Sequence, residues 1–454
     1  MQDYIAARIG AIEGSQFVQF PGPNPLLVPG EEGAWDDGML EMCDILKDNG
    51  KYYLYYHASG RGESYRVGVA VADNPLGPFV KHGTEPILDL TFGDGNDRYI
   101  ACGSILKEST DRYYLFYSLQ QKDDELNYYI GLATASHPLG PWTKYEGNPI
   151  MKNFGYVGGV TKRGEKYYMF NEYPTFVQAT DYGHISYATA DRPEGPWTPV
   201  TDAPVMSVEG WGTWDDGGYS ESNVKFDGSL FHMFYGGAKT HSYRLRSQES
   251  IGYAYSVDGT RFMKYGRNPV ARREELAWGA AMAECCFLLE YPNIYIYHTL
   301  RYTKGWTPSE RENKKFPAME HIGVEVLSLD SRPSVSYTAL TCPELTMGES
   351  YREGMQTPLS VGNANALSLT VSAVMSEFSE LQVKVYLGED PDRLSTVPVH
   401  TFHLAGPKKR GTASAVFTVP SLCSRFMKLE VLNAKRAGAK AVEDIRVDLH
   451  LVRN

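Results

Sequence analysis

Two short segments carry the same pair of carboxylates at the same place in a longer repeat. Trp35-Asp36-Asp37-Gly38 and Trp214-Asp215-Asp216-Gly217 each begin ten residues after a proline that opens a repeat, Pro25 or Pro204. The match is therefore one of position as well as of letters. We interpret these acids as candidates for chemistry, with one alternative: an aspartate before a glycine also stabilises turns, so the segment could be a structural device.

A third aspartate has the register of Asp37 in the next repeat. Asp97 lies eight residues before Ile105, as Asp37 lies eight residues before Ile45. Three glutamates lie farther along, in the segments that we predict to be the first strands of three repeats: Glu41, Glu221 and Glu284.

Alignment on the aromatic residues that come next puts Glu221 and Glu284 in one register and Glu41 one residue off. Because a shift of one residue moves a strand side chain to the other face, which of the three point inward stays open.

Several carboxylates in one space suit the cleavage of glycosidic bonds. One carboxylic acid protonates the leaving oxygen, and one carboxylate activates water or attacks the anomeric carbon. A third can keep the pKa of the acid high. Without a reaction, a metal or a positive group, such a cluster would repel itself. The catalytic candidates are Asp37, Asp97, Asp216, Glu221 and Glu284.

Aromatic and polar residues near these acids are candidates for sugar binding. Tryptophans in loops can stack on sugar faces, and arginine or histidine can bind hydroxyl groups or a substrate carboxylate. The alternative is that they are ordinary surface residues, because loops carry arginine and histidine in any case. The substrate-binding candidates are Trp35, Asp36, Arg98, Trp214, His241 and Arg301.

The elements that position these residues repeat five times at intervals of roughly 60 residues. Each unit has a Gly/Asp/Trp loop, a first strand, a tyrosine-rich second strand such as residues 51–58, a small-residue third strand such as residues 66–73, and a Pro-Gly-Pro-aromatic turn. Short strands separated by turns in such repeats predict an all-β protein with a five-bladed β-propeller. The Trp or Phe after each Gly-Pro is predicted to fill the gap between two blades.

After residue 332 the repeat ends. Residues 333–454 contain alternating runs such as 366–374 and 445–452, separated by turn residues, which predict a β-sandwich. The sequence thus predicts two domains, a propeller over 1–332 and a sandwich over 333–454. For the sandwich we favour a packing role over glycan binding.

Composition excludes some partners. A net charge of −11 argues against nucleic acid, and no stretch approaches 18 apolar residues, so no membrane segment is expected. The first residues lack the apolar core of a signal peptide. We expect a cytoplasmic protein, or a periplasmic or secreted one from which a signal has been removed.

The chain resembles the propeller glycosidases of glycoside hydrolase families 43, 32, 68 and 117. The resemblance rests on the G-x-W-D-D-G loop before DILKDNGKYYLYYHAS, on its repeat WGTWDDGGYSESNVKFDGSLFHMFYGG, and on the turns ADNPLGPF and ASHPLGPW. It covers residues 20–330. It implies that Asp37, with Asp36 as the alternative, is the base or nucleophile and that Glu221 is the acid.

The supporting aspartate of these families has no counterpart in the third repeat, so Asp97 or Asp216 would replace it. Glu284-Cys285 is similar to the Glu-Cys pair of the fructan enzymes but falls in the fifth repeat. The motifs Asn-Asp-Pro-Asn and Arg-Asp-Pro are absent from the sequence. These departures indicate a divergent member.

The leading hypothesis is an exo-acting glycoside hydrolase that removes a terminal sugar from a plant- or algal-type oligosaccharide. The alternatives are a phosphorylase of the family 130 kind, in which Arg98, His241 and Arg301 would hold phosphate, and a non-catalytic sugar-binding propeller. No cofactor is required, and hard oxygen ligands in the channel leave a structural calcium ion open.

Overall fold

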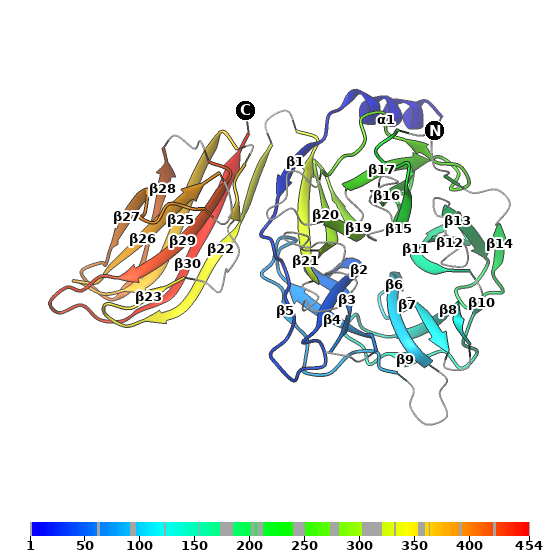
Figure 1. Cartoon of the computed structure of the whole chain (residues 1–454), viewed down its shortest axis with the longest axis horizontal. Helices are drawn as coiled ribbons and strands as arrows, with labels where there is room; N and C mark the ends of the chain where they lie inside the picture. The colour runs from blue at the N-terminus through cyan, green and yellow to red at the C-terminus, as the bar shows by residue number, and fades with distance from the viewer. Residues whose placement is uncertain are drawn as a thin grey trace.

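The computed structural model shows five antiparallel sheets arranged around a central channel, followed by two further sheets at the C-terminal end (Figure 1). This confirms the predicted all-β class and the five blades. The structure describes residues 2–60, 64–90, 97–121, 124–152, 154–172, 185–200, 205–206, 212–238, 250–272, 281–301, 320–330, 333–352, 359–362, 364–389, 393–420 and 424–453.

Each blade has its first strand at the channel and its later strands farther out. The first blade contains β2 (Met39–Asp48), β3 (Lys51–Ser59), β4 (Arg66–Ala72) and β5 (Val80–Lys81), and the second contains β6 (Asp97–Ser109), β7 (Arg112–Gln121), β8 (Asp124–Ala135), β9 (Thr143–Lys144) and β10 (Met151–Lys152). The third contains β11 (Tyr156–Arg163), β12 (Lys166–Glu172), β13 (Ile185–Ala190) and β14 (Thr198–Val200). The fourth contains β15 (Gly218–Phe226), β16 (Phe231–Ala238), β17 (Ser250–Ser256) and β18 (Met263–Lys264).

The fifth blade joins the two ends of the propeller sequence. It contains β19 (Ala281–Glu290), β20 (Asn293–Arg301) and β21 (Glu320–Ser328), and its outer strand is β1 (Val18–Pro21), which pairs with β21. The sequence pattern assigned neither this strand nor the helix α1 (Gln2–Gly14) before it. The helix is held on the fourth blade by an ion pair between Arg8 Nη1 and Asp227 Oδ2 (2.5 Å).

In four blades, the aromatic residue of the turn after the third strand packs on the second strand of the preceding blade; three of these turns contain Gly-Pro, and the turn before Phe262 contains Gly259-Thr260 instead. Phe79, Trp142, Trp197 and Phe262 lie edge-on to an aromatic ring there, with ring centroids 5.6 to 6.4 Å apart. In two blades the hydroxyl of the contacted tyrosine also donates to a carbonyl of the turn, as Tyr55 does to Pro138 (2.7 Å). The predicted filling of the gaps between blades is confirmed.

The asparagine of the Asn-Pro pair fastens the start of a repeat to a third strand. Asn148 Oδ1 accepts the backbone N–H of Leu132 (2.9 Å), and its Nδ2 donates to the carbonyl of the same residue (3.0 Å). Asn268 holds Tyr253 in the same way, and Asn24 holds Val324. These residues recur because the side-chain amide satisfies a donor and an acceptor of the strand edge at once.

The C-terminal residues form two antiparallel sheets. One contains β22 (Ser334–Leu345), β30 (Val442–Val452), β25 (Ala366–Met375) and β28 (Gly411–Val419), and the other contains β23 (Ser350–Tyr351), β24 (Leu359–Ser360), β29 (Phe426–Asn433), β26 (Glu380–Gly388) and β27 (His400–Ala405).

Every second residue of β25 and β26 is buried. Their apolar side chains, among them Leu369 and Val383, share one hydrophobic cluster with Phe20 and Val324 of the fifth blade. This is the pattern expected of a sandwich packed on the propeller, while the boundary at residue 332 stays a prediction.

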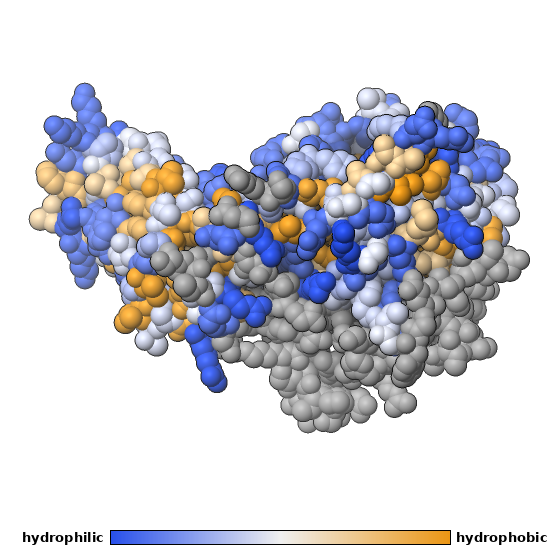
Figure 2. Space-filling model, turned by 90° about the horizontal axis from the view of Figure 1, so that it is seen from above, coloured by the Kyte–Doolittle hydropathy of each residue, from blue (hydrophilic) through white to orange (hydrophobic). Residues whose placement is uncertain are grey.

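On the face shown in Figure 2, the described surface carries hydrophilic residues with patches of apolar residues between them. Among the described residues, no helix is both long and apolar enough to cross a membrane.

Candidate active site

The first strands of all five blades carry a β-bulge. The pairing with the second strand shifts at Cys43 in β2, at Gly103 in β6 and at Gly158 in β11. In β15 the shift lies between Tyr219 and Ser222, and in β19 it lies at Glu284. A bulge kinks the strand and redirects side chains, and bulges are frequent next to active sites.

The bulges bring the three glutamates to one level of the propeller, meaning the same position along the first strand relative to the second strand. In three blades, an anchor residue of the second strand pairs with a glycine of the third strand: Tyr56 with Gly68, Tyr235 with Gly252, and His298 with Gly323. The first-strand partner of each anchor directly follows a glutamate: Met42 follows Glu41, Ser222 follows Glu221, and Cys285 follows Glu284.

The bulge in β2 comes after its glutamate, whereas the bulges in β15 and β19 contain theirs. Counting along the sequence places Glu41 one residue out of register with Glu221 and Glu284. The different positions of the bulges remove this offset.

Glu41 has a defined partner within its blade. Its Oε2 lies 2.5 Å from Nε2 of His57, which is only 5% exposed. The other ring nitrogen of His57 lies 3.4 Å from the thiol of Cys43, in the bulge. This contact orients the Glu41 carboxyl group and offers it a proton donor or acceptor. His57 was not among the sequence candidates, because its pairing with Glu41 depends on the strand register.

A row of tyrosines continues from His57 across the second and third blades. The ring of Tyr65 lies edge-on to His57 and to Tyr99, with centroids 5.1 Å apart in both cases. Tyr99 contacts Tyr156, whose hydroxyl donates to that of Tyr99 (3.2 Å), and Tyr128 packs on Tyr156 at 4.4 Å. Burial raises the pKa of Tyr156 well above its usual value, so the Tyr156 hydroxyl keeps the proton that it donates to Tyr99.

The two Trp-Asp-Asp-Gly segments have the same contacts in both blades. Asp36 is 3% exposed and accepts hydrogen bonds from Lys81 Nζ (2.5 Å) and from the hydroxyl of Tyr56 (3.2 Å). Asp215 is bonded likewise by Lys264 Nζ (2.8 Å) and by Tyr235 (3.4 Å). Both carboxylates are thus buried in ion pairs, which does not fit the predicted contact of Asp36 with substrate.

The neighbouring residues of these segments are also engaged. Trp35 stacks on Tyr56 (5.9 Å, 13°), and Trp214 packs on Tyr235 (5.8 Å). Asp37 Oδ2 accepts the N–H of Gly33 (2.7 Å), as Asp216 Oδ2 accepts that of Gly212 (2.8 Å). The repetition of these contacts favours the structural interpretation of both segments.

An ion pair crosses the channel beneath the level of the glutamates. Asp44 of β2, completely buried, lies 2.9 Å from Lys225 Nζ of β15, although the first and fourth blades are not neighbours. Asp44 Oδ2 also accepts hydrogen bonds from the Ser104 hydroxyl (3.1 Å) and the Ile105 N–H (3.0 Å) of the second blade. These contacts obstruct the channel on this side, which favours a pocket over a through-groove.

Several sequence candidates are placed only in part. Asp97 and Arg98 begin β6, with Asp97 opposite Gln121, and Arg301 ends β20, but their side chains lie outside the described part, as does that of Glu221. His241 lies entirely outside the described residues. Within the described part of the chain, no three His, Cys, Asp or Glu side chains gather as metal ligands.

Two histidines of the fifth blade are held neutral. Burial lowers the pKa of His298 to about 4, an effect that the carbonyl of Thr299 partly opposes. Burial and then the charge of Lys81 lower the pKa of His321 to about 4.

We expect stability to fall as the pH drops from about 6.5 to about 4. In this range the unfolded chain binds protons that the folded chain excludes, so the folded state loses free energy relative to it. His298→Tyr removes one of the two groups responsible, so the loss of unfolding free energy between these pH values should shrink by roughly 3 kcal/mol. Tyr is chosen because Tyr56 and Tyr235 occupy the equivalent anchor positions. Urea unfolding at a series of pH values measures this. His82→Tyr, at an exposed histidine, controls for the side-chain change, and an unaltered pH dependence in His298→Tyr would contradict the assignment.

Comparisons with known proteins agree with this architecture. No protein-family model matches the chain. A xylosidase/arabinosidase from Bacteroides ovatus is 26% identical over 256 residues, which cover 50% of this chain and 74% of that protein. A beta-xylosidase from Xylanibacter ruminicola is 28% identical over 228 residues, or 44% of this chain and 67% of that protein.

A solved glycoside hydrolase structure aligns with a TM-score of 0.50 and 12% identity, covering 72% of this chain and 95% of that one, which supports the fold alone. The repeats, the propeller and the two relatives together show a glycoside hydrolase that is similar to the five-bladed propeller enzymes of the family 43 kind.

Proposed function

We propose that the enzyme removes terminal sugars from xylose- or arabinose-containing oligosaccharides by carboxylate acid/base catalysis. The substrate class is supported by the names of the two relatives, a xylosidase/arabinosidase and a beta-xylosidase. The exo mode is supported by the ion pair between Asp44 and Lys225, which obstructs the channel and favours a pocket that accepts a chain end. For such polysaccharide-derived substrates we propose a periplasmic or extracellular site of action.

The observation that carries the assignment of roles is the common level of the three glutamates. We assign Glu221 as the general acid, as the family resemblance implies, and Glu41 as the base or nucleophile, oriented by His57 at 2.5 Å. Asp37, the base expected from the sequence, becomes the alternative, because its contact with Gly33 is duplicated by Asp216 and Gly212.

Supporting roles are proposed for the remaining carboxylates. Glu284 is half-buried, has a φ of 21° and lies at the level of the other two glutamates, so it is the candidate for holding the acid protonated. Asp97 is the second candidate for that role, and Asp216 the third. Two carboxylates supply all the chemistry of this reaction, so no cofactor is needed; a calcium ion in the channel would be structural.

The proposal is tested by release assays on aryl β-xylosides, aryl α-arabinofuranosides and the matching oligosaccharides, with and without phosphate. Glu41→Gln should lower kcat by about 10²–10⁴-fold. Asp37→Asn should stay within about tenfold of wild type, because its amide oxygen can still accept the Gly33 N–H. Sugar release should not need phosphate.

The opposite pattern, an inactive Asp37→Asn and an active Glu41→Gln, would return the base to Asp37. Release that requires phosphate would show a phosphorylase. Sugar binding without release from any substrate by the wild type would favour a non-catalytic module.

A further inference from the structure

A pocket of about 310 Å³ lies at the outer edge of the propeller, away from the first strands that line the channel. It is bounded by the segment before and within β1 (Gln16, Phe17, Gln19), by the connection that follows β18 (265–272) and by Arg453, directly after β30. Small-molecule sites commonly measure about 300–1,000 Å³ and often lie where separate parts of a protein meet. The pocket has the size and the place of such a site.

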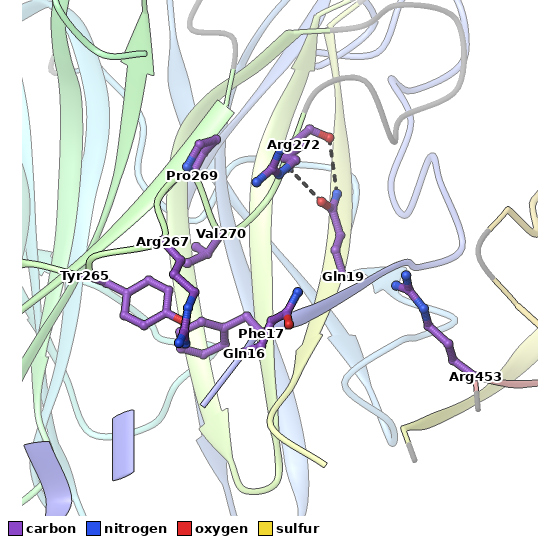
Figure 3. Close-up of a pocket in the computed structure, with 9 residues that line it drawn as sticks. All are labelled: Gln16, Phe17, Gln19, Tyr265, Arg267, Pro269, Val270, Arg272 and Arg453. Atoms are coloured by element: carbon purple, nitrogen blue, oxygen red, sulfur yellow. Dashed lines mark hydrogen bonds between the residues drawn. The ribbon is translucent and has the colours of Figure 1, made fainter. Parts of the chain in front are cut away.

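Three arginines from two distant parts of the chain line this pocket: Arg267, Arg272 and Arg453. Figure 3 shows Arg267 beside Tyr265 and Phe17, Arg272 above Gln19, and Arg453 on the opposite side. No acidic residue is among the nine that line the pocket. This concentration of positive charge contrasts with the net charge of −11 of the whole chain.

Hydrogen bonds fix the backbone of Arg272, and the residue lines the pocket. Gln19, which is 7% exposed, accepts the N–H of Arg272 (2.7 Å) and donates to its carbonyl (3.3 Å). The same amide donates to Glu325 (2.8 Å) on its other side, so the Glu325 carboxylate lies behind Gln19. A buried glutamine that holds both backbone groups of one residue sets where that residue's side chain starts.

Arg267 is also held in place, and the groups that hold it are backbone carbonyls rather than a carboxylate that would neutralise its charge. Its Nη1 donates to the backbone carbonyls of Ser15 (2.5 Å) and Glu13 (3.2 Å). The side chain of Glu13 instead accepts the hydroxyl of Tyr255 (2.9 Å). The remaining donors of the Arg267 guanidinium stay available to a ligand.

Among the described residues, no carboxylate lies within ion-pair distance of the guanidinium groups of Arg272 or Arg453. Three like charges that line one pocket repel one another, and a bound anion would relieve this repulsion. The planar guanidinium fork matches the two oxygens of a carboxylate, phosphate or sulfate group. Tyr265 and Gln16 add polar groups at the same pocket.

We propose that this pocket is a binding site for a compact oxyanion, supplied either by the carboxylate of an acidic sugar or by inorganic phosphate or sulfate. Arg272 and Arg453 bind the oxyanion directly, and Arg267 completes the positive wall. The site is separate from the three glutamates, so its occupancy does not depend on the proposed catalytic roles.

The test is calorimetric titration of the full chain at low salt with glucuronate, phosphate and sulfate, and with glucose as the uncharged match to glucuronate. We expect saturable binding of at least one oxyanion, no binding of glucose, and weaker binding as salt is added. Arg272→Gln and Arg453→Gln should each weaken binding at least about tenfold. Arg393→Gln, at an exposed arginine of the C-terminal sheets, is the charge-matched control and should bind as wild type does.

Tighter binding of glucuronate than of phosphate and sulfate would identify an acidic sugar as the ligand, and the reverse order an inorganic anion. The absence of saturable binding by all three oxyanions, or binding unchanged in both variants, would overturn the proposal. Hydrolysis of neutral aryl glycosides by Arg272→Gln should equal that of wild type, so that failure of this site and failure of the proposed catalytic site can be told apart.

Discussion

Glu221→Ala is expected to lower kcat on unactivated oligosaccharides by about 10²–10⁴-fold, while cleavage of a dinitrophenyl glycoside falls far less. The physical reason is that a general acid protonates the leaving oxygen, and dinitrophenolate leaves without a proton. Steady-state kinetics on both substrates measures the difference. The resemblance that places the acid at Glu221 is thereby tested by the chemistry of the leaving group rather than by loss of activity alone.

Glu284→Ala is the matched control, because Glu284 lies at the same level of the neighbouring blade. As the carboxylate that holds the acid protonated, it should slow the unactivated oligosaccharide more than the dinitrophenyl glycoside, by less than Glu221→Ala does, and this loss should shrink at lower pH, where the acid is protonated without its help. If the leaving-group dependence appeared in Glu284→Ala and was absent from Glu221→Ala, the acid would be Glu284. Equal losses on both substrates in Glu221→Ala would exclude Glu221 as the acid.

Asp44→Ala is expected to be the most destabilising substitution in the channel, at about 3–5 kcal/mol. The change leaves the Lys225 ammonium with the Ile45 carbonyl but without its carboxylate partner, and it removes the acceptor for the Ser104 hydroxyl and the Ile105 N–H. Buried donors without acceptors carry the full cost of lost hydration. The shift of the urea unfolding midpoint measures the effect.

Lys225→Met should cost less than Asp44→Ala, because the hydrogen bonds from Ser104 and Ile105 continue to stabilise the Asp44 carboxylate. The double variant should be more stable than the sum of the single losses predicts, since the second change then removes no partner. Additive losses would show that the two side chains do not act as a pair.

The site was predictable only where its residues belong to the repeat. The matching positions of Asp37 and Asp216 follow from letters and spacing, and the structure gives them matching contacts. What those contacts are could not be read from the sequence, because Lys81 and Lys264, which neutralise the adjacent Asp36 and Asp215, lie 45 or more residues away. A pattern within one loop does not reveal which distant side chain meets it.

The glutamates show a second limit. Counting residues separates Glu41 from the register of Glu221 and Glu284, and the bulges of the first strands remove this separation. A bulge changes the register by one residue without a distinct signature in the letters, and such a step decides which face of a strand a side chain occupies. His57 could not be identified as the partner of Glu41 for the same reason.

The blade count, the aromatic filling between blades and the glycosidase resemblance could be predicted from the sequence, because they depend on short patterns that recur from repeat to repeat and fold locally. How the ring closes, with β1 pairing β21 some 300 residues later, and how the channel is obstructed, with Asp44 meeting Lys225 across it, became visible in the folded protein alone. The same holds for the three arginines that share one pocket. These contacts join residues whose separation along the chain carries no periodic signal, so packing in three dimensions alone brings them together.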